Sequence, residues 1–70
     1  MKFAENLKEL REANNLSQND LAEKLGIKQS NISNWENGRN RAEYEHLIQL
    51  ADIFDVTLDE LLGRKNTPLK

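Results

Sequence analysis

Apolar residues recur at intervals of three and four along most of the chain, and no stretch alternates with the period of two that marks a β-strand. In the first segment the apolar positions are Phe3, Leu7 and Leu10, followed by Ala13 or Asn14. This spacing predicts a helix over residues 2–13 with one buried face. Asn14 and Asn15 are expected to end it, because asparagine competes for backbone hydrogen bonds and tolerates left-handed backbone.

Four further helices follow from the same spacing and from capping signals. Ser17 with Asp20, and Thr57 with Glu60, have the three-residue separation of a capping box. The predicted helices run from Ser17 to the residue before Gly26, near 29–36, about 43–54, and from Thr57 through Leu62. Each of the three glycines, Gly26, Gly38 and Gly63, follows a predicted helix end. The chain is therefore predicted to be all-α, with one five-helix domain over residues 1–63 and a C-terminal tail over residues 64–70.

The second and third predicted helices form a helix-turn-helix unit, because a short turn containing Gly26 joins them. Ala22 is small enough to let the two helices cross closely. Gly26 is expected to make the sharp turn without a Cβ clash. Ile32 and Trp35, three residues apart, are predicted to point inward and to hold the unit together.

The predicted helix at 29–36 has an unusual polar face. Ser and Asn are up to about 0.7 kcal/mol less favourable in a helix than Ala. At about 100° per residue, the outward positions are Ser30, Ser33, Asn34 and Asn37, with Gln29 on the flank. Such side chains suit base edges in the DNA major groove, where Gln and Asn bond adenine in two places. The alternative is an ordinary polar surface, but a merely solvated face would favour Glu, Lys and Ala, so the composition favours function.

Composition narrows the class of protein. The 70 residues are enough for one domain, and a content of 31% charged and 37% hydrophobic residues is typical of a soluble globular protein. The absence of Cys excludes a disulfide framework, a zinc-thiolate site and thiol catalysis. With one His, no Gly-rich phosphate loop and no clustered metal ligands, neither an enzyme nor a cofactor or metal is expected. No targeting segment or membrane span is visible, which favours the cytoplasm.

The formal net charge of −2 argues against a polyanionic partner, but the charge is unevenly placed. Residues 24–41 carry a net charge of +3, whereas residues 42–63 carry −6 and contain no Lys or Arg. This distribution predicts a domain with two unlike faces. Ordinary surface scatter remains the alternative interpretation.

Several segments together resemble the lambda-repressor-like helix-turn-helix domains of the phage Cro and repressor type, also called the XRE family. They are LSQNDLA (16–22), LG (25–26), IS (32–33), WENG (35–38), LA (50–51) and FDVTLDELL (54–62). The resemblance covers residues 3–63. It implies a compact five-helix domain that binds operator DNA, commonly as a dimer, and regulates transcription.

The resemblance also implies roles for individual residues. Gln29, Ser30 and Asn34 match base-contacting positions, with Lys28 and Ser33 nearby. The phosphate-contacting positions are Gln18, Asn37, Arg39 and Arg41, and Gln18 is also expected to brace the first residue of the third helix. Arg11 and Glu36 match a buried or half-buried ion pair. Judged without the family, Gln18 could simply be the first helical residue behind the Ser17 cap. Arg39 and Arg41 could be solvated loop charges, and Arg11 could be an exposed charge beside Glu9 or Glu12. The sequence departs from the family at Ala42, where Pro is common, and at Glu43 and Glu45, where some members are basic.

The last predicted helices hold more apolar residues than a short terminal segment needs. Most are expected to close the core, and a subset is expected to form a symmetric homodimer seam. The candidates for the seam are Phe54, Val56, Leu58, Leu61 and Leu62. Trp35 is expected in the core, and His46 on the surface.

These observations predict a sequence-specific double-stranded DNA-binding transcriptional regulator, a repressor, that places the helix at 29–36 in the major groove. A homodimer would bind a pseudo-palindromic operator. The alternative is a protein-interaction module, an antitoxin-like partner that binds through the acidic face of residues 42–63. Salt-sensitive DNA binding would distinguish the first function from the second.

Overall fold

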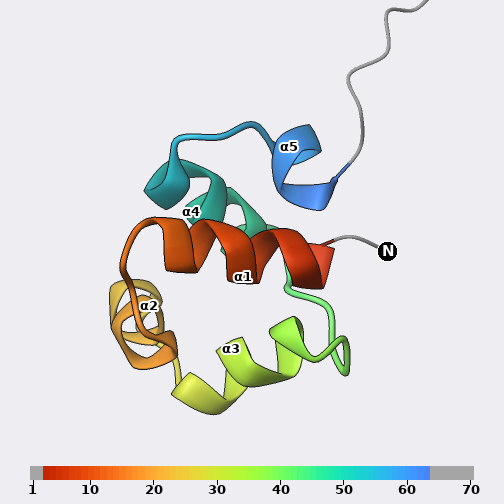
Figure 1. The fold of residues 1–70 in the computed structure, drawn as a ribbon. Coiled ribbons are helices and arrows are strands. Elements are labelled where there is room, and N and C mark those ends of the chain that lie inside the picture. The colour runs from red at the N-terminus through yellow and green to blue at the C-terminus, as the bar shows by residue number, and fades with distance from the viewer. Residues whose placement is uncertain (1–2, 64–70) are drawn as a thin grey trace, which may run out of the picture.

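The computed structural model describes residues 3–63, and these residues form five α-helices (Figure 1). The helices are α1 (Phe3–Ala13), α2 (Gln18–Leu25), α3 (Gln29–Glu36), α4 (Tyr44–Phe54) and α5 (Leu58–Leu62). No strand is found within residues 3–63, which confirms the predicted all-α class. The predicted start of the first helix at residue 2 and the predicted tail at 64–70 lie outside the described residues.

The first helix lies at the centre of the arrangement. In Figure 1, α2 and α3 lie on one side of α1, and α4 and α5 lie on the other. Helix α1 packs against both α3 and α5, while α2 packs against α3 and α4 packs against α5. One core joins all five helices, and its fully buried large side chains are Leu7, Leu21, Ile32, Leu50 and Leu61.

The predicted capping boxes set the starts of α2 and α5. The Asp20 backbone N–H donates to Ser17 Oγ at 2.9 Å, and the Ser17 N–H donates to Asp20 Oδ2 at 3.0 Å. Thr57 and Glu60 exchange the same two hydrogen bonds at 3.0 and 2.8 Å. Because a helix N-terminus leaves backbone donors without intrahelical partners, these reciprocal bonds satisfy groups that would otherwise need water.

The capping box of α2 predicts an acid-dependent loss of stability. The hydrogen bond from the Ser17 backbone lowers the pKa of Asp20 below its ordinary value of 3.8, and the Ser17 side chain adds to the shift. The ionised carboxylate therefore stabilises the fold fully above pH 3.8, and this contribution is lost as the pH falls through the lower pKa of the folded state.

We accordingly expect Asp20→Asn to be less stable than the unmodified chain near neutral pH. The difference in free energy of unfolding should shrink as the pH falls below 3.8. Urea unfolding followed by circular dichroism at a series of pH values measures it. Asp52→Asn, which removes an exposed carboxylate from α4, is the matched control. A difference that grows on acidification would contradict the assignment.

The helix ends show where glycine is needed and where it is not. Gly26, Gly38 and Gly63 all have left-handed backbone, as their positions after helix ends predicted. The expected reason at Gly26 needs correction, because no neighbouring atom lies within 4 Å of where its Cβ would be. Glycine is favoured there by its φ of 72°, which costs other residues strain.

Two non-glycine residues also adopt left-handed backbone. Asn15 does so after α1, as predicted, with a φ of 58°. Asp55 does so after α4, with a φ of 56°, and no glycine marked this turn in the sequence. At the other end of α4, Glu43 is an extended N-cap residue, so the helix begins at Tyr44, one residue later than predicted.

The burial of residues in the last two helices narrows the candidates for the expected dimer seam. Phe54 is 8% exposed and Leu61 is fully buried, so both belong to the core of the domain, where most of the apolar residues were expected. Val56, Leu58 and Leu62 are partly buried against that core. Among residues 3–63, no helix has both the length and the apolar character that crossing a membrane requires.

Candidate nucleic-acid interface

Helix α3 presents one apolar and one polar side. Ile32 is fully buried and Trp35 is 4% exposed, so the inner side anchors the helix in the core. Gln29 and Ser30 are exposed at its first turn, and Ser33 and Asn34 are half-buried further along. The outward side of α3 is thus formed by the uncharged polar side chains that the helical spacing predicted.

Helix α2 holds α3 in place through small and branched side chains. Ala22 is 1% exposed and lies in the same core as Leu21 and Ile32, where the two helices pack together. Lys28 is the N-cap residue of α3. Its side chain makes no capping hydrogen bond, and the residue is exposed beside the first turn. Rigid packing of this kind is what a helix needs if it is to present side chains in a fixed register.

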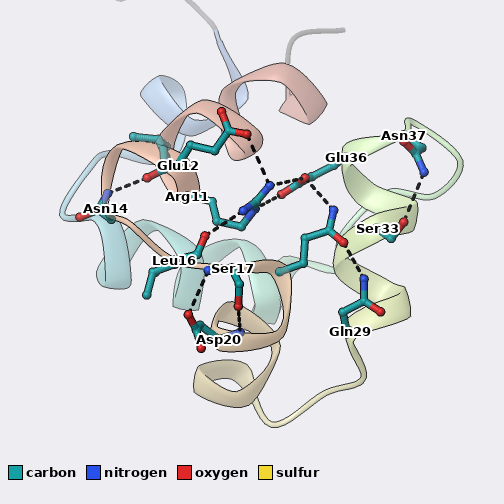
Figure 2. A network of polar contacts seen from close by, with 12 residues as sticks. Arg11, Glu12, Asn14, Leu16, Ser17, Asp20, Gln29, Ser33, Glu36 and Asn37 are labelled. Carbon is teal, nitrogen blue, oxygen red and sulfur yellow. Dashed lines mark hydrogen bonds and ion pairs between the residues drawn. The ribbon is translucent and has the colours of Figure 1, made fainter.

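A buried ion pair fixes the far end of α3. Arg11 donates from Nε to Glu36 Oε2 at 2.7 Å and from Nη2 to Glu36 Oε1 at 3.1 Å, a two-point contact between α1 and α3 (Figure 2). The Arg11 side chain is 10% exposed and the Glu36 side chain 4%. A third bond, from Nη1 to the Leu16 carbonyl oxygen at 2.8 Å, holds the loop before α2. The hydrogen bonds that Arg11 donates to Glu36 raise the pKa of Arg11 despite desolvation, so the guanidinium group stays charged.

Two glutamines extend this contact to the start of α3. Gln18 Nε2 donates to Glu36 Oε1 at 3.0 Å, and Gln29 Nε2 donates to Gln18 Oε1 at 2.5 Å. The brace that the resemblance implied between Gln18 and the first residue of the third helix is present as a hydrogen bond. Together, Arg11, Glu36, Gln18 and Gln29 form a hydrogen-bonded chain, which links three helices.

The loop after α3 carries the expected cationic side chains. Asn37, Arg39 and Arg41 are exposed, and the Arg39 backbone N–H donates to the Asn34 carbonyl oxygen at 2.9 Å, which folds the loop against the end of α3. Asn37 Nδ2 also donates to Ser33 Oγ at 3.3 Å. Over residues 3–63, the ion pairs within 4.0 Å all involve Arg11. No carboxylate within residues 3–63 therefore forms an ion pair with Arg39 or Arg41.

His46 does not lie freely on the surface, contrary to expectation. It is half-buried on α4, and its ring centroid lies 5.4 Å from that of Trp35, with the planes tilted by 47°. Its Nδ1 is buried without a hydrogen-bond partner among the described residues. Both residues line a hollow with Asn31, Asn40, Arg41 and Glu43, between α3 and the start of α4. The sequence contained no signal for this contact, because it depends on the path of the loop between the two helices.

The acidic residues of 42–63 are all exposed, and they lie on or next to α4 and α5. They are Glu43, Glu45, Asp52, Asp55, Asp59 and Glu60. Figure 1 places α4 and α5 across α1 from α3, so most of this charge lies away from the outward side of α3. No group of three His, Asp or Glu side chains within residues 3–63 could hold a metal ion.

This arrangement defines a helix-turn-helix protein, with a rigidly anchored second helix of the unit and a cationic loop beside it. Comparison with known proteins gives the same class. The family profile described as Helix-turn-helix matches residues 7–61. The chain belongs to this family, in its XRE-type, lambda-repressor-like branch.

Relatives and solved structures agree with the family assignment. The HTH-type transcriptional activator BcrR of Enterococcus faecalis is 44% identical over 63 residues, which cover 90% of this chain and 31% of BcrR. The HTH-type transcriptional regulator AnsR of Bacillus subtilis is 48% identical over 59 residues, which cover 84% of this chain and 51% of AnsR. The crystal structure of a transcriptional regulator from Listeria innocua superposes with a TM-score of 0.86 and 31% identity, over 96% of this chain and 63% of the regulator. The chain thus spans about half or less of these two curated relatives.

Proposed function

We propose that this domain is a sequence-specific, double-stranded DNA-binding transcriptional regulator that inserts α3 into the major groove. The outward side of α3 carries the argument, because it combines poor helix formers with side chains that bond base edges. Gln29, Ser30 and Asn34 would contact bases, with Lys28 and Ser33 beside them. The family and its regulators support this function over the antitoxin-like alternative.

The flanking groups are proposed to contact the DNA backbone. Gln18 begins α2, where backbone N–H groups and the helix dipole attract anions. Asn37, Arg39 and Arg41 are exposed in the loop at the opposite end of α3. Phosphate contacts on both sides of a recognition helix fix its register in the groove without contributing base specificity.

Arg41→Ala is expected to weaken binding to all duplexes by a similar factor. One lost phosphate contact lowers the slope of log K against log salt by about 0.9. Fluorescence anisotropy with an operator and a scrambled duplex, at several salt concentrations, measures both quantities. Lys8→Ala removes an exposed cation of α1, outside the proposed surface, and is the control. An unchanged slope for Arg41→Ala would remove this residue from the phosphate contacts.

Gln29→Ala and Asn34→Ala are expected to relax base preference without unfolding the domain. Each lost bidentate contact should reduce discrimination at one base pair by about 1–3 kcal/mol. Stability should change by no more than about 0.5 kcal/mol, because neither side chain belongs to the core. Gln49→Ala, which removes an exposed amide from α4, should leave both quantities unchanged. Should either α3 variant mainly unfold the protein, the assignment to base contacts is wrong.

The domain is proposed to act as a homodimer on a pseudo-palindromic operator. Two copies would place their α3 helices in successive major grooves about 34–36 Å apart. Phe54 and Leu61 belong to the core, so the remaining seam candidates are Val56, Leu58 and Leu62. The large apolar side chains most exposed among residues 3–63 are Tyr44 and Ile48 on α4.

We propose that the domain represses transcription, and that it does so by occupying the DNA and not by catalysis. A domain bound over a promoter excludes other proteins from it simply by being bound. The proposed function requires no cofactor, and we propose the cytoplasm as the compartment in which the protein acts.

Selection from randomised DNA duplexes with the purified protein tests the proposal. Recovery of one sequence in two inverted copies is expected, and their spacing reports the geometry of the dimer. A single unrepeated site would contradict the dimer but support sequence-specific binding. If no sequence is enriched and the protein also shows no salt-sensitive affinity for DNA, the proposed function is wrong.

A further inference from the structure

Asn37 and Gly38 form the one Asn-Gly pair of the sequence, and both residues are exposed at the end of α3. An asparagine amide loses ammonia when the backbone nitrogen of the next residue attacks its Cγ. A side chain on that next residue crowds the attack, and glycine has none. No described atom lies within 4 Å of where a Cβ of Gly38 would be, so the surroundings leave room for the ring that forms.

Two hydrogen bonds keep the reacting groups apart in the folded chain. The Gly38 N–H donates to the Trp35 carbonyl oxygen at 3.2 Å, and Asn37 Nδ2 donates to Ser33 Oγ at 3.3 Å. Both distances lie at or beyond the long end of the usual range for N–H donors to oxygen, and the last turn of a helix frays. The restraint is therefore weak, and we expect the reaction to proceed through brief opening of this turn.

We propose that Asn37 is a site of spontaneous deamidation, and that this modification weakens DNA binding. The Gly38 nitrogen gives up its proton and bonds to Asn37 Cγ, while the bond from Cγ to Nδ2 breaks and Nδ2 takes up a proton and leaves as ammonia. Water then opens the resulting succinimide ring at one of its two carbonyl groups. Residue 37 becomes aspartate or isoaspartate, and either product carries a carboxylate where the chain had a neutral amide.

The new charge would lie in the loop that is proposed to contact DNA phosphates, so the inference rests on the proposed function. Arg39 and Arg41 are exposed in this loop, and no carboxylate within residues 3–63 forms an ion pair with either of them. A carboxylate at residue 37 would partly neutralise these cations and repel a phosphate. We expect affinity for every duplex to fall by about tenfold at low salt, and the slope of log K against log salt to fall by about 1.

Incubation of the free protein at mildly alkaline pH, followed by peptide mapping with mass spectrometry, measures the reaction. Asn37 should be modified several times faster than Asn40, which is exposed in the same loop but precedes Arg41. Ser33→Ala removes one of the two restraining hydrogen bonds and should speed the modification of Asn37. A rate at Asn37 no greater than that at Asn40 overturns the inference. An equal rate in Ser33→Ala and the parent chain overturns the restraint assigned to the end of α3.

Binding of the incubated protein to the selected operator and to a scrambled duplex measures the consequence. Affinity for both should fall in step with the modified fraction at residue 37, and freshly prepared Asn37→Asp should reproduce the low affinity. Asn37→Gln is the matched control, because it keeps the amide while its longer side chain forms the corresponding ring much more slowly. Its affinity, whatever the starting value, should stay constant during incubation. An equal loss of affinity in Asn37→Gln would assign the loss to another change and overturn the inference.

The two measurements separate this inference from the proposed function. If Asn37 is modified rapidly but the modified chain binds DNA as before, the inference fails and the proposed function stands. If the fresh protein selects no sequence and has no salt-sensitive affinity for DNA, the proposed function fails. The inference about DNA binding then fails with it, whatever the rate of modification at Asn37.

Discussion

Glu36→Ala is expected to lower the free energy of unfolding by about 3–5 kcal/mol, because it leaves the Arg11 guanidinium group buried without its counter-ion. Gln18 loses its acceptor at the same time. A domain of this length has a free energy of unfolding on the order of 3–5 kcal/mol. The variant should therefore be largely unfolded at room temperature, as measured by the helical circular dichroism signal and by urea titration.

Two control variants show whether burial is the cause. Glu12 also lies near Arg11, at 3.9 Å, but its side chain is 57% exposed. Glu12→Ala should therefore cost no more than about 1 kcal/mol. The double variant Arg11→Met/Glu36→Met removes both charges and should recover much of the loss from Glu36→Ala. A loss below about 1 kcal/mol for Glu36→Ala would show that the pair behaves like an exposed one.

Ile32→Ala is expected to cost about 2–5 kcal/mol, because it opens a cavity where α3 meets the core. Ile32 is fully buried and belongs to the same core as residues of α1 and α2. DNA binding should be lost together with stability, since α3 would no longer be held in place. Thermal unfolding and binding to the selected operator are the two measurements.

Ile32→Val provides the graded comparison. Removing a single methyl group should cost about 0.5–1.5 kcal/mol and should leave base preference unchanged. Asn34→Ala, which changes a residue outside the core, should do the opposite. It should change base preference without a loss of stability. If Ile32→Ala were as stable as Ile32→Val, the core around α3 would not be packed as the structure shows.

Local patterns predicted the helices because their causes are local. The apolar spacing, both capping boxes and the left-handed turn at Asn15 each depend on residues within a few positions of one another. The left-handed backbone of Asp55 was not predicted, because no glycine marks this turn, although Asp is enriched among the non-glycine residues that adopt positive φ. The exact start of α4 was missed by one residue, because Glu43 lies at its N-cap without the usual capping side chain.

The candidate site was predicted in part. The outward side of α3 followed from helical geometry, since Ile32 and Trp35 fix which side faces the core. The pairing of Arg11 with Glu36 joins residues 25 positions apart, and only the family resemblance suggested it. The bond between Gln18 and Glu36, and the contact between Trp35 and His46, were not predicted, because each depends on how whole helices are placed.

Helix α3 divides its two tasks between different residues. The side chains that hold it in the fold, Ile32 and Trp35, are buried, and those proposed to contact bases are not. Mutations at Ser30 or Asn34 can therefore accumulate with little penalty to folding. A lineage that carries this domain can acquire a new operator, and so escape cross-talk with a sister regulator, while the scaffold stays the same.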